Sequence, residues 1–136
     1  MSVVIHHNPA CGTSRNTLAM IRASGVEPVI VEYLRTGWTR PQLQALFAGA
    51  GLTPRAALRV NNTPAGELGL TDPSASDDAI LEAMVAHPVL VERPIVVTRR
   101  GIRLCRPSET VLEILENPHF GRFTKEDGEV VETGRA

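Results

Sequence analysis

Cys11 is the residue whose type and setting most clearly favour chemistry. It lies in the loop formed by residues 7–12, after a β-branched run at residues 3–5 and before a segment with helical spacing. A thiol at a helix N-terminus faces backbone N–H groups and the positive end of the helix dipole, which favour the thiolate. Cysteines so placed have pKa values of about 3.5–7.5, compared with about 8.5 for a free thiol. The sequence therefore predicts a nucleophile. The alternative, a buried inert thiol, fits poorly in a loop bracketed by proline and glycine.

The same position suits an oxyanion substrate, because several N–H groups converge at a helix N-terminus. Arginine side chains would complete such a site, since the guanidinium fork matches tetrahedral oxyanions. Arg93 and Arg106 are the stronger candidates, because each precedes a proline at a predicted strand end. Arg59 has weaker support from the residues alone. Thr17 stands where the C-x5-R loop of tyrosine-phosphatase-like enzymes carries its arginine, so that loop is absent.

Residues near Cys11 indicate how the thiol would work. His7 is placed either to support the thiolate by a hydrogen bond or by charge, or to serve as an exposed polar loop residue. Arg15 points either toward the anion or toward solvent. Ser14 occupies the position of the second cysteine of a C-x-x-C pair, so Cys11 must act alone or with an external thiol. Cys105 ends a predicted strand and is interpreted as a structural thiol.

The composition excludes several classes of protein. The chain has 136 residues, of which 43% are hydrophobic and 21% charged, as expected of one globular domain. Its net charge is −1 with both signs mixed, which argues against a nucleic-acid surface. No run is long enough to span a membrane, and no basic N-terminal region indicates a signal peptide. The two cysteines are expected to be reduced thiols, and no structural metal site is expected.

The elements that must position these residues follow a β-α-β, helical insert, β-β-α order. The expected elements are strands at 3–5, 28–33, 93–98 and 102–105, helices at 13–24, 39–50 and 76–86, a short helix from Thr53-Pro54 and a last helix capped by Ser108. This order predicts an α/β, thioredoxin-like fold with a mixed four-stranded sheet flanked by helices. The domain would span residues 1–116, with the insert at about 39–87, and residues 117–136 would form a loosely packed tail. Pro94 falls where that fold places a cis-proline facing the active-site cysteine.

The segment around Cys11 resembles the active-site segment of the glutathione- and glutaredoxin-coupled arsenate reductases. That segment is His7-Asn8-Pro9-Ala10-Cys11-Gly12-Thr13-Ser14-Arg15-Asn16-Thr17. The resemblance continues along nearly the whole chain, in Leu58-Arg59, Glu67-Leu68-Gly69-Leu70, His87-Pro88, Glu92-Arg93-Pro94-Ile95-Val96-Val97 and Leu104-Cys105-Arg106-Pro107-Ser108-Glu109. Only the extreme C-terminus diverges.

The resemblance implies a cytoplasmic enzyme of arsenic detoxification. It implies that Cys11 attacks arsenate, that Arg59, Arg93 and Arg106 bind the oxyanion, and that His7 helps to tune the thiol. It further implies glutathione as co-substrate, glutaredoxin as partner and no bound cofactor. Two alternatives stay open on the same fold. One is a glutathione-dependent thiol oxidoreductase, which loss of one arginine would have favoured. The other is a non-catalytic transcription regulator contacting RNA polymerase, which would typically carry a C-x-x-C switch.

Overall fold

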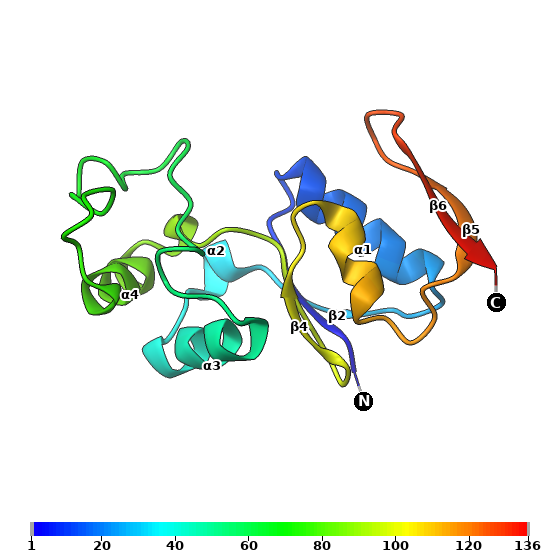
Figure 1. The fold of residues 1–136 in the computed structure, drawn as a ribbon, viewed down its shortest axis with the longest axis horizontal. Helices are drawn as coiled ribbons and strands as arrows, with labels where there is room; N and C mark the ends of the chain where they lie inside the picture. Colours follow the sequence, from blue (N-terminus) through cyan, green and yellow to red (C-terminus); the bar gives the residue numbers. More distant parts are fainter. Residues whose placement is uncertain (1, 136) are drawn as a thin grey trace. The chain divides into compact units, whose positions relative to one another are not determined.

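The chain forms two compact units in a computed structural model that describes residues 2–135 (Figure 1). Unit 1 combines the N-terminal segment up to Glu32 with the segment from Arg93 onward, and unit 2 is Tyr33–Glu92. The domain boundaries predicted from the sequence, 1–116 with an insert at about 39–87, stay a prediction. Within the described range, no helix is long and apolar enough to cross a membrane.

Unit 1 is built on a four-stranded mixed sheet with strand order β2-β1-β3-β4. Its elements are β1 (Val4–His6), α1 (Gly12–Ala23), β2 (Val29–Val31), β3 (Ile95–Thr98), β4 (Gly101–Leu104), the 3₁₀ helix η2 (Ser108–Glu113), β5 (Phe120–Thr124) and β6 (Val130–Arg135). β1 runs parallel to β2 and antiparallel to β3, and β3 runs antiparallel to β4. The predicted fold class, a thioredoxin-like mixed sheet flanked by helices, is confirmed.

The register of the sheet brings the chemistry-bearing loops to one edge. His6, the last residue of β1, pairs with Ile95, the first residue of β3, and Ile95 also pairs with Leu104, the last residue of β4. The loop that follows β1 therefore leaves the sheet where β3 begins and β4 ends. This arrangement places the Cys11 loop, Arg93 and Arg106 at the same edge, although they are far apart in sequence.

The core of unit 1 lies between the sheet, α1 and η2. The buried residues that form it are Val3, Ile5, Met20, Ile21, Val96, Cys105, Val111, Ile114 and Leu115. Met20 and Ile21 come from one face of α1, as the spacing of its apolar residues predicts. α1 is thereby fixed on the sheet, and its N-terminus at Cys11 is fixed with it.

The segment that follows β4 differs from the helix expected there. It is the six-residue 3₁₀ helix η2, in which Ser108 is the first residue and Pro107 holds the N-cap position. Ser108, Val111 and Ile114 are all buried, and their spacing of three matches the three residues per turn of a 3₁₀ helix. Burial of this stripe explains why the segment winds more tightly than an α-helix. The peptide bonds before Pro94 and Pro107 are both cis, which answers for Pro94 a question that the sequence left open.

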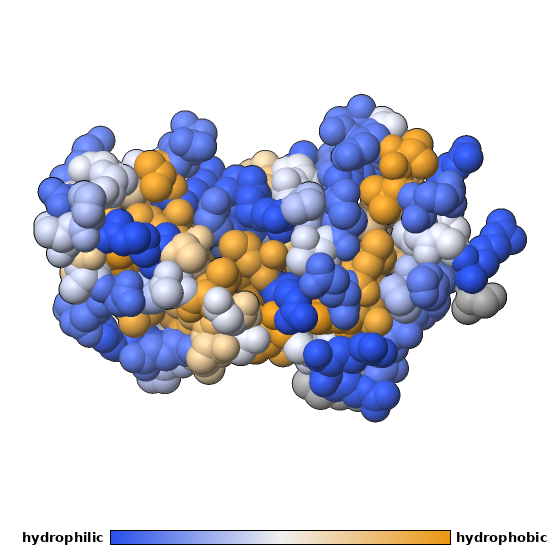
Figure 2. Space-filling view, viewed as in Figure 1, coloured by the Kyte–Doolittle hydropathy of each residue, from blue (hydrophilic) through white to orange (hydrophobic). Residues whose placement is uncertain are grey.

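The C-terminal segment, expected as a loosely packed tail, is instead an antiparallel hairpin of β5 and β6 that lies beside α1 (Figure 1). Phe120, Phe123 and Val131 pack against the core of unit 1. Asp127-Gly128 forms the turn, with Gly128 at a φ of 92°, a conformation that favours glycine. Hydrophobic and hydrophilic side chains lie side by side over this hairpin (Figure 2). An Asp-Gly pair between short apolar runs is a hairpin signal that the polar composition of the tail had obscured.

Unit 2 is mainly helical and contains α2 (Tyr33–Thr36), α3 (Arg40–Ala50), α4 (Asp77–Ala86) and the 3₁₀ helix η1 (Pro88–Leu90). Thr39 and Gln42 form the predicted capping box at the start of α3. The short helix expected from Thr53-Pro54 is absent from this part of the structure, where the chain forms turns leading to an isolated bridge between Leu58 and Val91. The N–H of Arg59 donates to the carbonyl of Leu90 at 2.8 Å. This pairing uses backbone groups that a helix would have engaged internally.

Candidate active site

Cys11 is the N-cap residue of α1, with the extended backbone (φ −99°, ψ 121°) that a cap position requires. Its own N–H donates to the carbonyl of Asn8 at 3.0 Å, and its carbonyl accepts from the N–H of Arg15 at 2.9 Å. Both backbone groups are therefore engaged, one in the loop and one in the helix. The side chain is 7% exposed, so the thiol is held in a fixed position at the edge of the sheet.

The surroundings of Cys11 favour its thiolate. Burial raises the pKa of the Cys11 thiol, but this effect is outweighed by four groups that lower it: the backbone N–H of Ser14, the charge of Arg93, the guanidinium of Arg106 and the backbone N–H of Thr13. The net result is a pKa below the ordinary value of a cysteine. The N–H groups act here as dipoles at the start of α1, as the sequence led us to expect.

Two of the three predicted arginines lie at this thiol. Nη1 of Arg106 is 3.8 Å from Sγ of Cys11 and donates to the carbonyl oxygen of Arg93 at 3.1 Å. Arg106 is exposed and Arg93 is partly exposed, so neither guanidinium is sealed inside the protein. A cationic cradle of this kind fits a tetrahedral oxyanion at the sulfur, because guanidinium groups and helix N–H groups both bind such anions.

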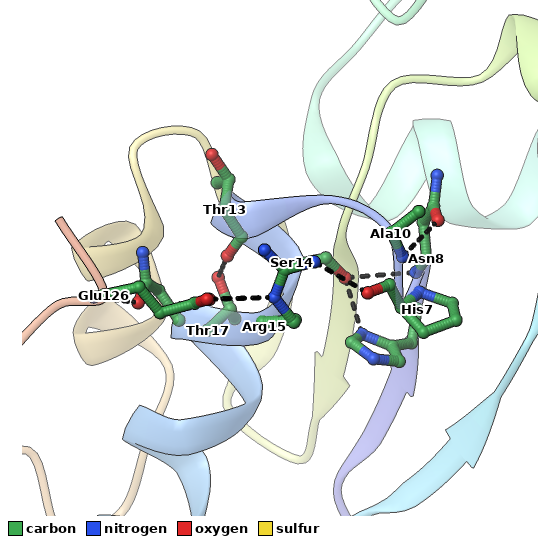
Figure 3. Close-up of polar contacts among 10 residues, drawn as sticks. His7, Asn8, Ala10, Thr13, Ser14, Arg15, Thr17 and Glu126 are labelled. Atoms are coloured by element: carbon green, nitrogen blue, oxygen red, sulfur yellow. Dashed lines mark hydrogen bonds and ion pairs between the residues drawn. The ribbon is translucent and has the colours of Figure 1, made fainter.

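His7 and Ser14 form a buried pair that joins the loop before Cys11 to the start of α1 (Figure 3). Nδ1 of His7 lies 2.6 Å from Oγ of Ser14, and the N–H of Asn8 donates to the same Oγ at 3.1 Å. Burial lowers the pKa of His7, and nearby Arg15 and Arg22 lower it further against the opposing charge of Glu32. Imidazole is therefore neutral at pH 7. His7 contacts the Cys11 helix through Ser14 and supplies no positive charge to the thiolate.

Comparisons with known proteins decide the family. The model of the ArsC family matches residues 6–114 of this chain. The chain belongs to the ArsC family. It is 60% identical over 131 residues to the arsenate reductase of Rhizobium meliloti strain 1021, covering 96% of this chain and 94% of that protein. It is 56% identical over 130 residues to the arsenate reductase of Escherichia coli strain K12, covering 96% of this chain and 92% of that protein.

The solved structures agree with the sequence comparison. The arsenate reductase from Vibrio cholerae matches with a TM-score of 0.80 and 46% identity, covering 85% of this chain and 98% of that chain. The resemblance drawn from the active-site segment is thus confirmed, and the two alternatives on the same fold are not favoured.

The third arginine, Arg59, belongs to unit 2 of this ArsC-family chain. Its Nε donates to the carbonyl of Asn61 at 3.1 Å, and its hydroxyl-bearing neighbour Thr63 donates to the Arg59 carbonyl at 2.8 Å. The structure thus brings Cys11, His7, Ser14, Arg93 and Arg106 together in unit 1 and places Arg59 in the other unit. Its role toward the oxyanion stays a prediction.

Cys105 is the structural thiol that its strand position predicted. It is 0% exposed and belongs to the core of unit 1. Burial raises the pKa of Cys105 to about 12, with a smaller contribution from Glu113 in the same direction and an opposing one from Arg103. Cys105 therefore stays protonated and is not placed to act as a second redox thiol for Cys11.

The sequence analysis assigned no role to two residues near the site, Asn8 and Glu126. Oδ1 of Asn8 accepts the N–H of Ala10 at 2.9 Å, which shapes the loop before Cys11. The Asn-Pro pair that begins this loop is a known turn signal. Arg15, whose orientation was left open, pairs with Glu126 through Nε at 2.9 Å (Figure 3). Glu126 is 111 residues away in sequence, so no local pattern could have indicated it.

Proposed function

We propose that this protein reduces arsenate to arsenite in arsenical detoxification, with Cys11 as the nucleophile. The observation that carries the proposal is the position of a thiol with lowered pKa at the N-cap of α1, with the guanidinium of Arg106 3.8 Å from its sulfur. A thiolate beside a cationic cradle is the arrangement that attack on an oxyanion requires. Membership of the ArsC family and identity of 53–60% to named arsenate reductases support the substrate.

In the first step, Sγ of Cys11 forms a bond to arsenic while one As–O bond breaks and its oxygen leaves as hydroxide or water. Arsenic keeps its oxidation state of five in this adduct. Arg93, Arg106 and the first N–H groups of α1 hold the negative charge of the remaining oxygens. Arg59 is proposed as a third arginine at the same anion.

The two electrons come from external thiols, because Cys105 is buried with a raised pKa. Glutathione condenses on the arsenic with loss of water. A glutaredoxin thiolate then attacks the glutathione sulfur, which forms a mixed disulfide and leaves the electron pair on arsenic. Hydrolysis of the bond between Cys11 and As(III) releases arsenite and returns the thiol. Glutathione is a co-substrate in this scheme, no bound cofactor takes part, and the cytoplasm is the proposed location of the enzyme.

His7 and Ser14 are proposed as positioning residues for the thiol. Ser14 Oγ accepts the N–H of Asn8, so its own proton is available for Nδ1 of the neutral His7. This assignment gives His7 the tautomer with its proton on Nε2. The pair joins the loop before Cys11 to the first turn of α1, and it thereby fixes the N–H of Ser14 that lowers the pKa of the thiol.

The proposal is tested by arsenite release from arsenate with glutathione and glutaredoxin supplied, each omitted in turn. We expect turnover in the complete mixture and a fall to background when either reductant is left out. Absence of arsenite from the complete mixture would contradict arsenate reduction. Equal turnover without glutaredoxin would contradict the proposed electron source, but it would not contradict arsenate as the substrate.

A further inference from the structure

The guanidinium of Arg15 joins two parts of unit 1, the loop before Cys11 and the turn between β5 and β6. Its Nε donates to both carboxylate oxygens of Glu126, at 3.1 and 2.9 Å, and its Nη1 donates to the carbonyl of Pro9 at 2.8 Å. Pro9 belongs to the loop before Cys11, and Glu126 belongs to the turn between β5 and β6. The Arg15 guanidinium therefore bonds to the hairpin through Nε and to the Cys11 loop through Nη1 (Figure 3).

A second contact joins the same turn to the same helix. The backbone N–H of Glu126 donates to Oδ1 of Asn16 at 3.0 Å. The turn is itself closed by two backbone bonds between Lys125 and residues 128 and 129, at 2.9 and 2.8 Å. Glu126 thus projects from a closed turn. Its carboxylate accepts from Arg15 and its backbone N–H donates to Asn16, and these two residues are neighbours near the start of α1.

The hairpin turn is also anchored beside the segment that carries Arg106. Nζ of Lys125 bonds Glu109 at 2.9 Å and Glu129 at 2.8 Å, and the Lys125 side chain is only 9% exposed. Glu109 lies in η2, three residues after Arg106. The base of the turn is therefore fixed to η2, which begins two residues after Arg106, while its tip is fixed to α1, whose N-cap is Cys11.

We propose that Glu126 is a positioning residue for Cys11, because it holds the Arg15 guanidinium on the Pro9 carbonyl and so fixes the loop from which the thiol projects. The inference rests on the proposed function, in which the thiol must be aimed at arsenic. Glu126 does not touch the sulfur or the arsenate. It acts through Arg15, and the C-terminal hairpin is thereby a working part of the catalytic unit.

The effect concerns geometry more than stability. The side chains of Arg15 and Glu126 are 45% and 50% exposed, and exposed ion pairs contribute little to folding stability. Positioning errors act differently, since a displacement of about 1 Å at a reacting group can lower a rate about 100-fold. Loss of the Glu126 carboxylate leaves the sheet, α1 and the arginine cradle in place, and it releases the loop.

The test compares Glu126→Gln with Glu132→Gln. Both variants remove one carboxylate from the hairpin, but Glu132 pairs with Arg122 of the same hairpin and so does not link the hairpin to α1. For Glu126→Gln we expect kcat to fall about tenfold, which is a smaller loss than the roughly 100-fold expected for a displacement of about 1 Å. The KM for arsenate should change little, because the arginines and N–H groups that bind the anion are intact. Glu132→Gln should match the wild type. Arg15→Gln and the double variant Arg15→Gln/Glu126→Gln should have the same kcat.

A second measurement is independent of arsenate turnover. Iodoacetamide should alkylate Cys11 several-fold faster in Glu126→Gln than in the wild type. Cys11 is only 7% exposed in the wild type, and release of the loop would make its thiol more accessible. Cys105, which is 0% exposed, should stay unlabelled and so exclude general unfolding. Opposite changes in alkylation and turnover are the signature of a positioning residue.

Three results would overturn the proposal: a Glu126→Gln variant that behaves like Glu132→Gln, additive losses in the double variant, or labelling of Cys105 in Glu126→Gln. The first would show that the pair is an ordinary surface contact. The second would show that Glu126 does not act through Arg15, and the third would show a structural defect. If the wild type releases no arsenite, the proposed function fails, and the alkylation rates still decide whether Glu126 positions the thiol.

Discussion

Replacement of Cys11 by serine is expected to reduce arsenate turnover at least about a thousandfold, to the level of the reaction without enzyme. The serine hydroxyl is not ionised near pH 7, and it forms no sulfur–arsenic bond through which external thiols can act. The backbone N–H groups and the arginines would remain, so the variant should still bind arsenate. The measurement is arsenite release with glutathione and glutaredoxin, together with arsenate binding by calorimetry.

The matched control is Cys105→Ser, because the chain has two cysteines. Cys105 lies in the core of unit 1, so a hydroxyl there is expected to lower the unfolding midpoint but to leave kcat per folded molecule unchanged. Turnover that survives in Cys11→Ser would contradict the nucleophile. Loss of turnover in folded Cys105→Ser would show that a second thiol of this chain takes part.

Replacement of Arg106 by alanine is expected to lower kcat/KM about 100- to 1000-fold, the usual effect of removing one donor to a developing oxyanion. The guanidinium of Arg106 lies at the reacting atom, with Nη1 3.8 Å from the Cys11 sulfur. Its loss also raises the pKa of Cys11, because Arg106 is among the groups that lower it. Arg93→Ala should act in the same direction on both quantities, since its charge also lowers the Cys11 pKa.

The control for charge is Arg100→Ala at the exposed tip between β3 and β4. This variant also removes one positive charge from unit 1, but the charge is not beside the thiol. We expect kcat/KM to change less than about twofold, as for an exposed charge screened by solvent. Arg106→Lys should recover only part of the activity, because lysine keeps the charge without the planar fork. Equal losses in Arg106→Ala and Arg100→Ala would contradict the proposed oxyanion site.

The sequence predicted the elements of unit 1 well where local pattern and tertiary packing agree. The β-branched runs at β1 and β3, the glycine at the start of β4 and the apolar face of α1 all indicate their structures directly. The 3₁₀ form of η2 was not predicted, because apolar residues spaced by three and by four are present together in residues 108–115. Only packing on the sheet decides which spacing is buried.

Site residues could be predicted from the sequence where they lie beside the end of a predicted strand or the start of a predicted helix. Cys11, Arg93 and Arg106 carry such local signals, whereas Arg59 was identified through the resemblance alone. The partner of Arg15 could not be predicted, because Glu126 lies in a polar segment whose hairpin becomes evident only once Phe120 and Phe123 are seen packed on the core. Long-range ion pairs leave no periodic trace in a sequence.

The central claim is that the fold lowers the pKa of the Cys11 thiol and raises that of Cys105. The direct test is the rate of iodoacetamide alkylation at each cysteine as a function of pH, followed by mass spectrometry of the two peptides. The claim predicts a Cys11 midpoint below the value of about 8.5 for a free thiol, so that the rate falls only as the pH drops through that lowered pKa. It also predicts no labelling of Cys105, whose pKa is raised to about 12. A Cys11 midpoint at or above that of a free thiol would contradict it.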